Sequence, residues 1–403
     1  MNRAIGWALA ALALAGCQGT ARQPRPATVA AIPGPVAGDA SQIARMRTAA
    51  AQVLFWSQNQ RDANFRRMER IFPTHVVRAG GRVRPLPAGA PLPLPAAEID
   101  AYMTANHVAG IIVVQDGRVR LERYAMGFTR EGRWTSFSVA KSFTSTLVGA
   151  AIRDGFIRSV NDLVTCYIPE LAGSGYDGVT VAQLLTMTSG VRWNESYIDP
   201  NSDVARMFVV PVPDGQDPTV AYMRTLPRES APGAQWVYKT GETNLVGVLV
   251  RRATGMPLAT YLSRRVWIPA GMEHDAYWMI DQSTQEVGGC CLSVSLPDYA
   301  RMGLYALEGG RRGGAVPATW FAEATRAHAP VGAPGSGFGY GYQWWTYPEG
   351  RYGAQGIFGQ SITIDPARRL VIAIVSSWPQ ATGRELSAAR TRFIASVVAA
   401  AAR

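Results

Sequence analysis

Strand-like segments lie at both ends of this chain of 403 residues, and helix-like segments lie between them. Residues 111–115 and 118–124 are rich in β-branched residues and flank Asp116-Gly117, a dipeptide typical of two-residue hairpin turns. Three more strand-like runs lie near the C-terminus, at residues 340–346, 361–365 and 370–376. The pattern predicts an α+β fold in which one antiparallel sheet, closed by both ends of the chain, carries an inserted helical region.

The middle of the chain, residues 142–288, is mostly helix-like, and Thr180 to Gln183 read as a capping box that opens one helix. The last segment, residues 384–401, places Leu386, Ala389, Phe393 and Val397 on one helical face, which predicts a terminal helix flanking the sheet. We expect one folded domain over residues 43–403, with an α/β part at about 43–155 and 288–403 and a helical part at about 156–287.

The N-terminus has the features of an export signal. Arg3 is followed by an apolar stretch that is too short to span a bilayer and that ends in Leu14-Ala15-Gly16-Cys17. A small residue before Cys17 is typical of bacterial lipoproteins, although an ordinary secretory leader with an incidental cysteine is the alternative. We expect residues 1–16 to be removed and residues 17–42, rich in Pro and Ala, to form a tether. The protein would then be periplasmic and lipid-anchored to a membrane through Cys17, the outer membrane in a Gram-negative cell.

The charge pattern argues against a nucleic-acid partner. The formal net charge is +11, but the arginines are spread without a basic run, which indicates a solvated basic surface. Of the 40 basic residues only Lys141 and Lys239 are lysines. A residue that must release its proton cannot be arginine, because a guanidinium stays protonated near neutral pH. Both lysines lie in segments that have features of an active site.

Ser138-Val139-Ala140-Lys141 has Ser-x-x-Lys spacing. If a helix begins here, residues three apart share a face, so the Lys141 amine can reach the Ser138 hydroxyl. The helix N-terminus would also place positive partial charge beside the serine. Free lysine ionises near pH ~10.4, so Lys141 acts as a base only if it is desolvated or near other cations. Ser136 and Ser142 are competing nucleophiles, but neither has a lysine three residues later.

Two later segments complete a candidate active site. Tyr238 follows a Pro-Gly turn and precedes a helix-like segment, which suits a phenol held on a loop to relay a proton to a leaving group. Packing of the ring under the loop is the alternative. Residues 352–360 contain several glycines just before a strand, so the backbone can approach a substrate there and an N–H can complete an oxyanion hole.

These three elements, in this order, resemble the β-lactamase-related serine hydrolases. That superfamily includes class C β-lactamases, D,D-peptidases, family VIII carboxylesterases and 6-aminohexanoate-dimer hydrolases, and the last branch is the most similar. The similarity runs from about residue 55 to the C-terminus. It also includes Leu184-Leu185-Thr186-Met187-Thr188-Ser189-Gly190, Gly288-Gly289-Cys290-Cys291-Leu292-Ser293 and Asp298-Tyr299-Ala300-Arg301.

The resemblance implies a β-lactamase/D,D-peptidase-like fold and a serine hydrolase that needs no cofactor or metal. It implies that Ser138 is acylated, that Lys141 and Tyr238 handle protons, and that the N–H groups of Ser138 and Ile357 form the oxyanion hole. Residues expected to line the substrate pocket are Tyr197, Thr240, Ala354 and Gly356.

Two departures from the family pattern bear on the substrate. Thr240 stands where the β-lactam enzymes have Asn, and Ala354-Gln355-Gly356 stands where they have Lys-Thr-Gly. A cation for a substrate carboxylate is therefore missing at position 354, although an arginine from another loop is a candidate replacement. We expect a small-molecule ester or linear amide as substrate. The alternatives are a β-lactamase or D,D-peptidase, and a non-catalytic lipoprotein that binds cell-wall fragments.

The remaining cysteines and the histidines give no further site. Cys166, Cys290 and Cys291 fit no zinc pattern, and adjacent cysteines seldom pair, so we expect at least one free buried thiol. The four histidines lie in no recognisable constellation and no Gly-x-Ser-x-Gly occurs, which disfavours a Ser-His-Asp triad.

Overall fold

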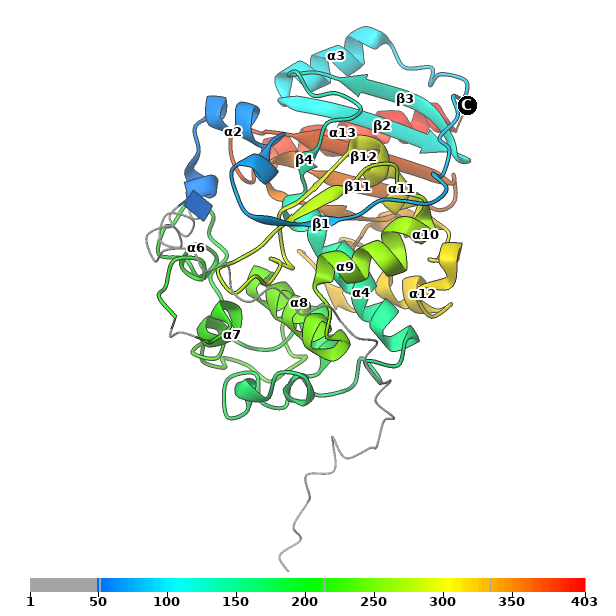
Figure 1. Cartoon of the computed structure of the whole chain (residues 1–403). Helices are drawn as coiled ribbons and strands as arrows, with labels where there is room; N and C mark the ends of the chain where they lie inside the picture. The colour runs from blue at the N-terminus through cyan, green and yellow to red at the C-terminus, as the bar shows by residue number, and fades with distance from the viewer. Residues whose placement is uncertain (1–48, 51, 213–214, 334, 403) are drawn as a thin grey trace, which may run out of the picture.

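The computed structural model describes residues 49–50, 52–212, 215–333 and 335–402 (Figure 1). The expected signal peptide, the tether and the lipidation site Cys17 lie outside these residues. Within them, no helix is both long enough and apolar enough to cross a membrane.

The main sheet is antiparallel and has eight strands in the order β3-β2-β12-β11-β10-β9-β8-β7. Strands from the N-terminal part pair with strands from the C-terminal part, as the sequence predicts. The bounds are β2 (Val108–Gln115), β3 (Arg118–Tyr124), β7 (Ala329–Pro330), β8 (Gly339–Tyr340), β9 (Trp345–Thr346), β10 (Tyr352–Gln355), β11 (Ser361–Asp365) and β12 (Leu370–Ser376).

Local turn chemistry explains the β2–β3 hairpin. Asp116 and Gly117 both have positive φ, 50° and 75°, which is the backbone of a type I′ turn. The expected single strand at residues 340–346 is wrong. It consists of β8 and β9 joined by a tight turn, in which the N–H of Gly341 donates to the carbonyl of Trp344 at 2.8 Å.

Both faces of the main sheet are covered. Alternate residues of β2 point to opposite sides, so Ile111 and Val113 pack in one core with α3 (Ala96–Ala105) and α13 (Arg384–Ala401). Ile112 and Val114 pack in a larger core with α11 (Leu296–Leu307). The sheet therefore forms the middle layer of the upper part of Figure 1, and the terminal helix α13 flanks it as predicted.

A second sheet of four short strands, in the order β1-β5-β6-β4, departs from the single sheet expected from the sequence. The strands are β1 (Thr74–Val77), β4 (Trp134–Thr135), β5 (Ala276–Met279) and β6 (Leu292–Val294). β5 falls inside the range assigned to the helical part but pairs with β1 and β6. β4 lies directly before Ser138, so this sheet fixes the segment that carries the candidate nucleophile.

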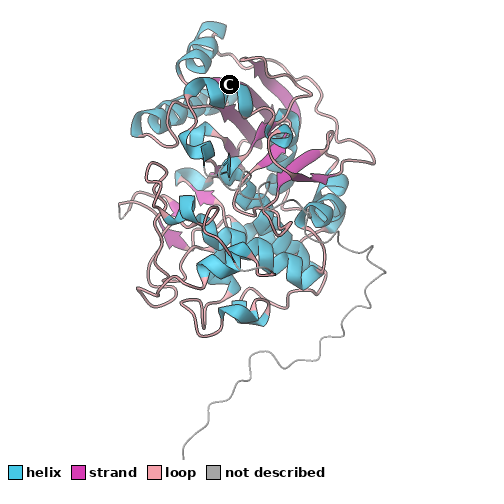
Figure 2. Ribbon diagram, turned by 60° about the vertical axis from the view of Figure 1, so that its left-hand side comes forward, coloured by secondary structure: helices cyan, strands magenta, loops and turns pink. Residues whose placement is uncertain are grey.

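The helical region lies below the main sheet in Figure 1 and consists of helices joined by long loops (Figure 2). Its central helix is α4 (Ala140–Arg153), in which every residue from Ala140 to Ala151 is buried and which packs against α8 (Thr240–Thr254). The predicted capping box of Thr180 and Gln183 opens α5. The other α-helices are α2 (Gln58–Asn64), α5 (Val181–Leu185), α6 (Asp203–Arg206), α7 (Pro218–Met223), α9 (Leu258–Leu262), α10 (Ile268–Ala270) and α12 (Trp320–Ala324).

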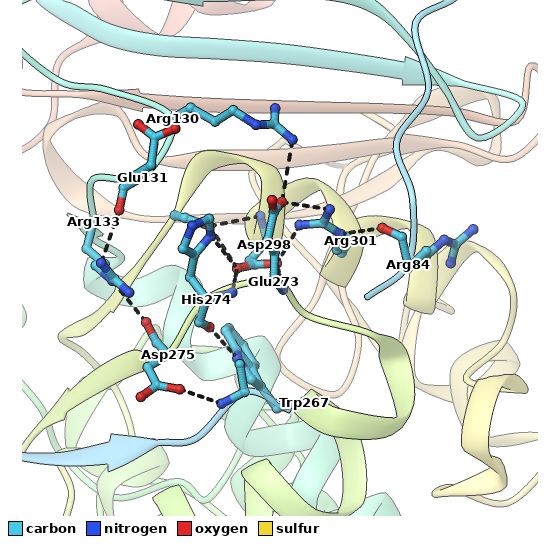
Figure 3. Close-up of polar contacts among 12 residues, drawn as sticks. Arg84, Arg130, Glu131, Arg133, Trp267, Glu273, His274, Asp275, Asp298 and Arg301 are labelled. Carbon is cyan, nitrogen blue, oxygen red and sulfur yellow. Dashed lines mark hydrogen bonds and ion pairs between the residues drawn. The ribbon is translucent and has the colours of Figure 1, made fainter. Parts of the chain in front are cut away.

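A buried ionic network fastens α11 to the segment that precedes β5 (Figure 3). Asp298 pairs with Arg301 at 2.8 Å and accepts the backbone N–H groups of Glu273 and His274 at 2.8 and 3.0 Å. Arg301 also pairs with Glu273 at 2.9 Å. Burial alone would raise the pKa of the Asp298 carboxyl, but the hydrogen bond from His274, the charge of Arg301 and the backbone donors outweigh it, so this pKa is lowered.

Asp298→Asn is expected to destabilise the fold without touching the candidate site. Removing the Asp298 charge leaves the Arg301 guanidinium, only 2% exposed, with Glu273 as its remaining carboxylate partner. Breaking a buried pair outright costs about 3–5 kcal/mol, so the loss here should approach the lower end of that range. Denaturant unfolding measures the loss. The control is Glu323→Gln, which breaks an exposed pair with Arg326 and should cost under ~1 kcal/mol. Equal effects of the two variants would contradict a stabilising role for the network.

Candidate active site

Ser138 lies on the one-turn segment η3 (Phe137–Val139), between β4 and α4. It is part-exposed and lines two adjoining hollows. The competing serines are buried, and their hydroxyls donate to carbonyls: Ser136 to Phe137 at 3.0 Å and Ser142 to Gln343 at 2.7 Å. Of the three serines, only Ser138 presents its hydroxyl to a cavity.

Lys141 is buried on the first turn of α4, facing Ser138 as the three-residue spacing predicts. Its Nζ lies 3.2 Å from Ser138 Oγ, 3.0 Å from Thr240 Oγ1 and 2.7 Å from the carbonyl oxygen of Gly289. A neutral amine has two N–H donors and one lone pair. Thr240 Oγ1 and the carbonyl oxygen of Gly289 can accept hydrogen bonds from the two N–H groups. The lone pair is then left to accept the hydroxyl proton of Ser138.

Burial lowers the pKa of the Lys141 ammonium to about 7, against a smaller opposing contribution from the charge of Glu195. At neutral pH a large fraction of the amine is therefore unprotonated. This is the form in which lysine can act as a base.

Turnover is expected to follow the ionisation of Lys141. Since the neutral amine is the active form, kcat/KM for an ester should fall about tenfold per pH unit below pH ~7 and level off above it. Glu195→Gln removes the carboxylate that raises this pKa, so the acid limb should move to lower pH. Stopped assays across pH 5–9 on the wild-type chain and on Glu195→Gln measure the shift. An acid limb that Glu195→Gln leaves in place would contradict the assignment to Lys141.

Tyr238 lies on the loop before α8, where aromatic rings hold it. Its ring stacks on Trp345 with centroids 5.7 Å apart and meets the edge of Tyr340 at 6.2 Å. Lys141 Nζ lies 5.2 Å from the centre of the Tyr238 ring. Burial, followed by the charge of Glu195, raises the pKa of the phenol well above its usual range, and hydrogen bonding to Ser138 opposes this only in part. Tyr238 therefore stays protonated and can donate a hydrogen bond. Its ring packs against Trp345 and Tyr340 and also lies beside Lys141, so the packing role and the role in the site occur together.

The two expected oxyanion donors lie at the starts of one-turn helices that meet at the cavity. Ser138 is the second residue of η3 and Ile357 the first of η9 (Ile357–Gly359), positions whose N–H groups have no partner within the turn. Both residues line the same two hollows. Gly356 permits their approach, because a Cβ there would lie 2.6 Å from the carbonyl oxygen of Ser136 and 3.1 Å from the nitrogen of Ser138.

Two phenylalanines beside these donors have left-handed backbones. Phe137 (φ 42°) precedes Ser138, and Phe358 (φ 59°) follows Ile357. Bulky residues rarely adopt this conformation unless surrounding structure enforces it. Their rings pack 5.3 Å apart, and Phe65 contacts both, at 4.9 and 5.3 Å. This ring cluster fixes the two donor segments relative to each other.

Glu195 is an important residue at the site, and no sequence motif singled it out; of its segment only Tyr197 was expected at the pocket. Its carboxylate accepts hydrogen bonds from the hydroxyl of Tyr197 at 2.7 Å, from the backbone N–H of Thr240 at 2.9 Å and from the hydroxyl of Thr240. Tyr197 lines both hollows and Thr240 one of them. Glu195 therefore orients Thr240, which in turn contacts Lys141.

The second lysine has a different setting. Lys239 is 1% exposed and pairs with the buried carboxylate of Glu242 at 3.6 Å. Burial raises the pKa of Glu242 to about 7, and Lys239 is the largest opposing influence. Lys239 lines neither hollow. It lies next to Tyr238 in the sequence, but its role is to form a buried ion pair beside the site.

The expectation of a free thiol is wrong for the described part of the chain, where no cysteine is free. Cys290 and Cys291 form a disulfide with each other. The backbone of Cys291 is left-handed (φ 70°) in the turn before β6, and the two side chains meet there. Both line the smaller hollow next to Ser138.

The two hollows differ in character. The smaller, about 50 Å³, is mainly apolar and is bounded by side chains such as Val204, Phe208 and Met279. The larger, about 580 Å³, is bordered by Tyr238, Trp345, Gln355 and Arg390. Gly356 lies at its wall, but Ala354 does not: its side chain is 1% exposed and packs in the core. Since side chains alternate along β10, it is the neighbouring Gln355 that faces the cavity.

A part-exposed serine whose hydroxyl contacts a buried lysine at the start of a helix is the arrangement of a serine hydrolase. The Beta-lactamase family model matches residues 96–396, and the chain belongs to this family of serine hydrolases. A 6-aminohexanoate-dimer hydrolase from Paenarthrobacter ureafaciens is 33% identical over 284 residues, which are 66% of this chain and 72% of that protein. A β-lactamase from Pseudomonas fluorescens is 24% identical over 185 residues, 44% of this chain and 48% of that one.

Solved structures agree with the fold. A Bacillus anthracis structure assigned as a 6-aminohexanoate-dimer hydrolase superposes with a TM-score of 0.74 at 22% identity, covering 83% of this chain and 93% of that one. A penicillin-binding protein homologue from Pyrococcus abyssi gives a TM-score of 0.58 at 20% identity, covering 74% and 76%. The β-lactamase/D,D-peptidase-like α+β fold is thus confirmed.

Proposed function

We propose that this chain hydrolyses small-molecule esters or linear amides through an acyl-enzyme on Ser138. The observation that carries the proposal is the 3.2 Å contact between Ser138 Oγ and Lys141 Nζ, an amine whose pKa burial lowers to about 7. The 33% identity to a 6-aminohexanoate-dimer hydrolase supports the same substrate class.

In the acylation step, Ser138 Oγ attacks the substrate carbonyl carbon while its proton passes to Lys141 Nζ. The carbonyl oxygen gains negative charge, which the N–H groups of Ser138 and Ile357 stabilise. When the bond to the leaving group breaks, the leaving atom takes a proton from the Tyr238 phenol, and Lys141 returns its proton to Tyr238. The products are an acyl ester on Ser138 and a neutral leaving group.

In the deacylation step, a water molecule attacks the ester carbonyl and gives its proton to the same amine. The tetrahedral intermediate again places its oxygen between the two N–H groups. Ser138 leaves as the alcohol, reprotonated by Lys141, and the acid product departs. Each proton that enters Lys141 also leaves it, so the enzyme returns to its starting state.

The preference for linear substrates over β-lactams rests on position 354. The related β-lactam enzymes have a lysine there, whereas Ala354 is uncharged and buried. A charge-assisted hydrogen bond to a carboxylate at that place is therefore absent, a loss of about 1.5–3 kcal/mol per bond for a ring-attached carboxylate.

A hydrolysis screen tests the proposal. It compares a butyrate ester, a linear amide, a cephalosporin and a D-Ala-D-Ala peptide by kcat/KM. We expect the ester or the amide to be cleaved faster than both of the others. Faster hydrolysis of the cephalosporin would favour a β-lactamase, and faster cleavage of the peptide a D,D-peptidase. A protein that cleaves none of them and takes no label on Ser138 would be a binding protein for cell-wall fragments.

We also propose that the chain is exported and lipid-anchored to the membrane through Cys17, on the strength of the leader sequence. Metabolic labelling with palmitate tests this. The label should appear in the wild-type chain and be lost in Cys17→Ser; labelling that persists in that variant would contradict the anchor site.

A further inference from the structure

Arg390 brings a positive charge from the terminal helix to the larger hollow. It lies on α13 (Arg384–Ala401), far along the chain from Ser138, yet both residues line this cavity. Its side chain is only 7% exposed, and its guanidinium lies over the Trp378 ring at 5.1 Å. The arginine is thus held by packing while its charged end borders the space beside the candidate nucleophile.

Among the described residues, no carboxylate lies within ion-pairing distance of Arg390. Arg390 Nη2 donates a hydrogen bond to Gln355 Oε1, a neutral acceptor, and Gln355 itself donates to the hydroxyl of Tyr347 at 2.8 Å. The similarly buried Arg301 has two carboxylate partners, Asp298 and Glu273 (Figure 3). A buried charge is costly unless it is paired, so an uncompensated guanidinium at a cavity wall is ready to receive an anion.

The surroundings favour a planar, two-oxygen anion. A guanidinium presents parallel N–H donors that match the two oxygens of a carboxylate. Gln355 and Trp378 hold the group in place, which lowers the entropy lost when a ligand binds. The family's usual cation is absent at Ala354, so this chain's cavity has its positive charge at a different wall.

We propose that Arg390 binds a carboxylate of the substrate, and that the substrates are linear esters or amides carrying a carboxylate away from the bond that is cleaved. The proposal rests on the function proposed above, because it concerns the same cavity. Arg390 is then a substrate-binding residue that selects acidic over neutral compounds.

Matched pairs of substrates test the selection. The first pair is mono-p-nitrophenyl adipate and its methyl ester, with the carboxylate in the acyl part. The second is the hexanoyl ester of 4-hydroxybenzoate and that of methyl 4-hydroxybenzoate, with the carboxylate in the leaving group. We expect Arg390→Gln to lower the acid-to-neutral ratio of kcat/KM by about tenfold to a hundredfold in at least one pair. Arg390→Lys should lose less, since it keeps the charge.

The ratio is independent of how much of each preparation is folded, because both substrates are measured on the same enzyme. The matched control is Arg392→Gln, an exposed arginine on the same helix that lines neither hollow, which should leave both ratios unchanged. If Arg390 only supports Gln355, acid and neutral substrates lose activity together. An unchanged ratio in both pairs, or an equal fall in the Arg392 control, would overturn the proposal.

A binding measurement separates this proposal from the proposed reaction. In the Ser138→Ala background, calorimetry compares N-hexanoyl-β-alanine with its methyl ester. We expect the acid to bind the Ser138→Ala variant at least tenfold more tightly than it binds the double variant Ser138→Ala/Arg390→Gln. This holds whether or not the wild-type chain hydrolyses the acid. Equal affinities with and without Arg390 would contradict the carboxylate site even if Ser138 proves to be the nucleophile.

Discussion

Ser138→Ala is expected to remove nearly all ester hydrolysis, a loss on the order of 10⁴- to 10⁶-fold in kcat, while the protein stays folded. Without the hydroxyl no acyl-enzyme can form, and the remaining donors stabilise only direct attack by water. The Ser138 hydroxyl caps neither η3 nor α4, so its removal should change the free energy of unfolding by less than ~1 kcal/mol. Initial rates on a butyrate ester and a denaturant melt measure the two effects.

Ser142→Ala is the matched control for that experiment. Its hydroxyl donates to the carbonyl of Gln343 inside the core, so its removal should cost about 1 kcal/mol of stability and leave turnover within a few fold. Loss of activity in Ser142→Ala with retention in Ser138→Ala would move the nucleophile to position 142.

Lys141→Arg should be as inactive as Lys141→Ala. The proposed role is to accept the proton of Ser138, and a guanidinium cannot do so near neutral pH. Arginine fills 38 of the 40 basic positions in this chain, so the lysine here is not explained by a need for charge alone. We expect both variants to lose at least about a thousandfold in kcat/KM.

The pH profile of these variants distinguishes a lost base from a misplaced side chain. Whatever activity remains should lack the acid limb near pH 7 that we assign to Lys141, because no group with that pKa is left at the Ser138 hydroxyl. Near-wild-type rates in Lys141→Arg would show that only positive charge is needed, and the base would then have to be another residue.

Local signals made the main sheet predictable. The Asp116-Gly117 turn fixes the β2–β3 hairpin within a few residues, and β11 and β12 match the predicted bounds. The second sheet could not be predicted in this way. Its strands have two to four residues each and pair across long stretches of sequence, as Thr135 does with Ser293. Strands that short carry no alternation to read, so only the folded chain defines them.

The candidate site likewise combines contacts that local sequence spacing predicts with contacts that only the folded chain defines. Ser138 and Lys141 are three residues apart, so helix geometry alone predicts their contact. Glu195, Gln355 and Arg390 reach the site by tertiary folding, so residue spacing along the chain does not predict their roles. One signal was present: Arg390 falls four residues after Leu386 and three before Phe393, on the apolar face of the terminal helix. A charged residue within an apolar face needs a partner or a function.

The disulfide shows where a general rule fails. Adjacent cysteines seldom pair because most backbones hold their side chains apart. Here the turn that exposes the Gly289 carbonyl to Lys141 also places Cys291 in a left-handed conformation, and the sulfurs of Cys290 and Cys291 meet. The backbone conformation of this turn allows the two cysteines to pair, and the sequence alone does not define that conformation.

The most direct test of the central claim is to locate the covalent adduct of a fluorophosphonate, which loses fluoride when a nucleophilic hydroxyl attacks its phosphorus. Trypsin should release residues 134–141 as one peptide, which holds both Ser136 and Ser138, and residues 142–153 as the next. We predict that fragment ions place the adduct on Ser138 and that Ser138→Ala takes up no label. An adduct on Ser136, on Ser142 or outside these peptides would contradict the assignment of Ser138 as the nucleophile.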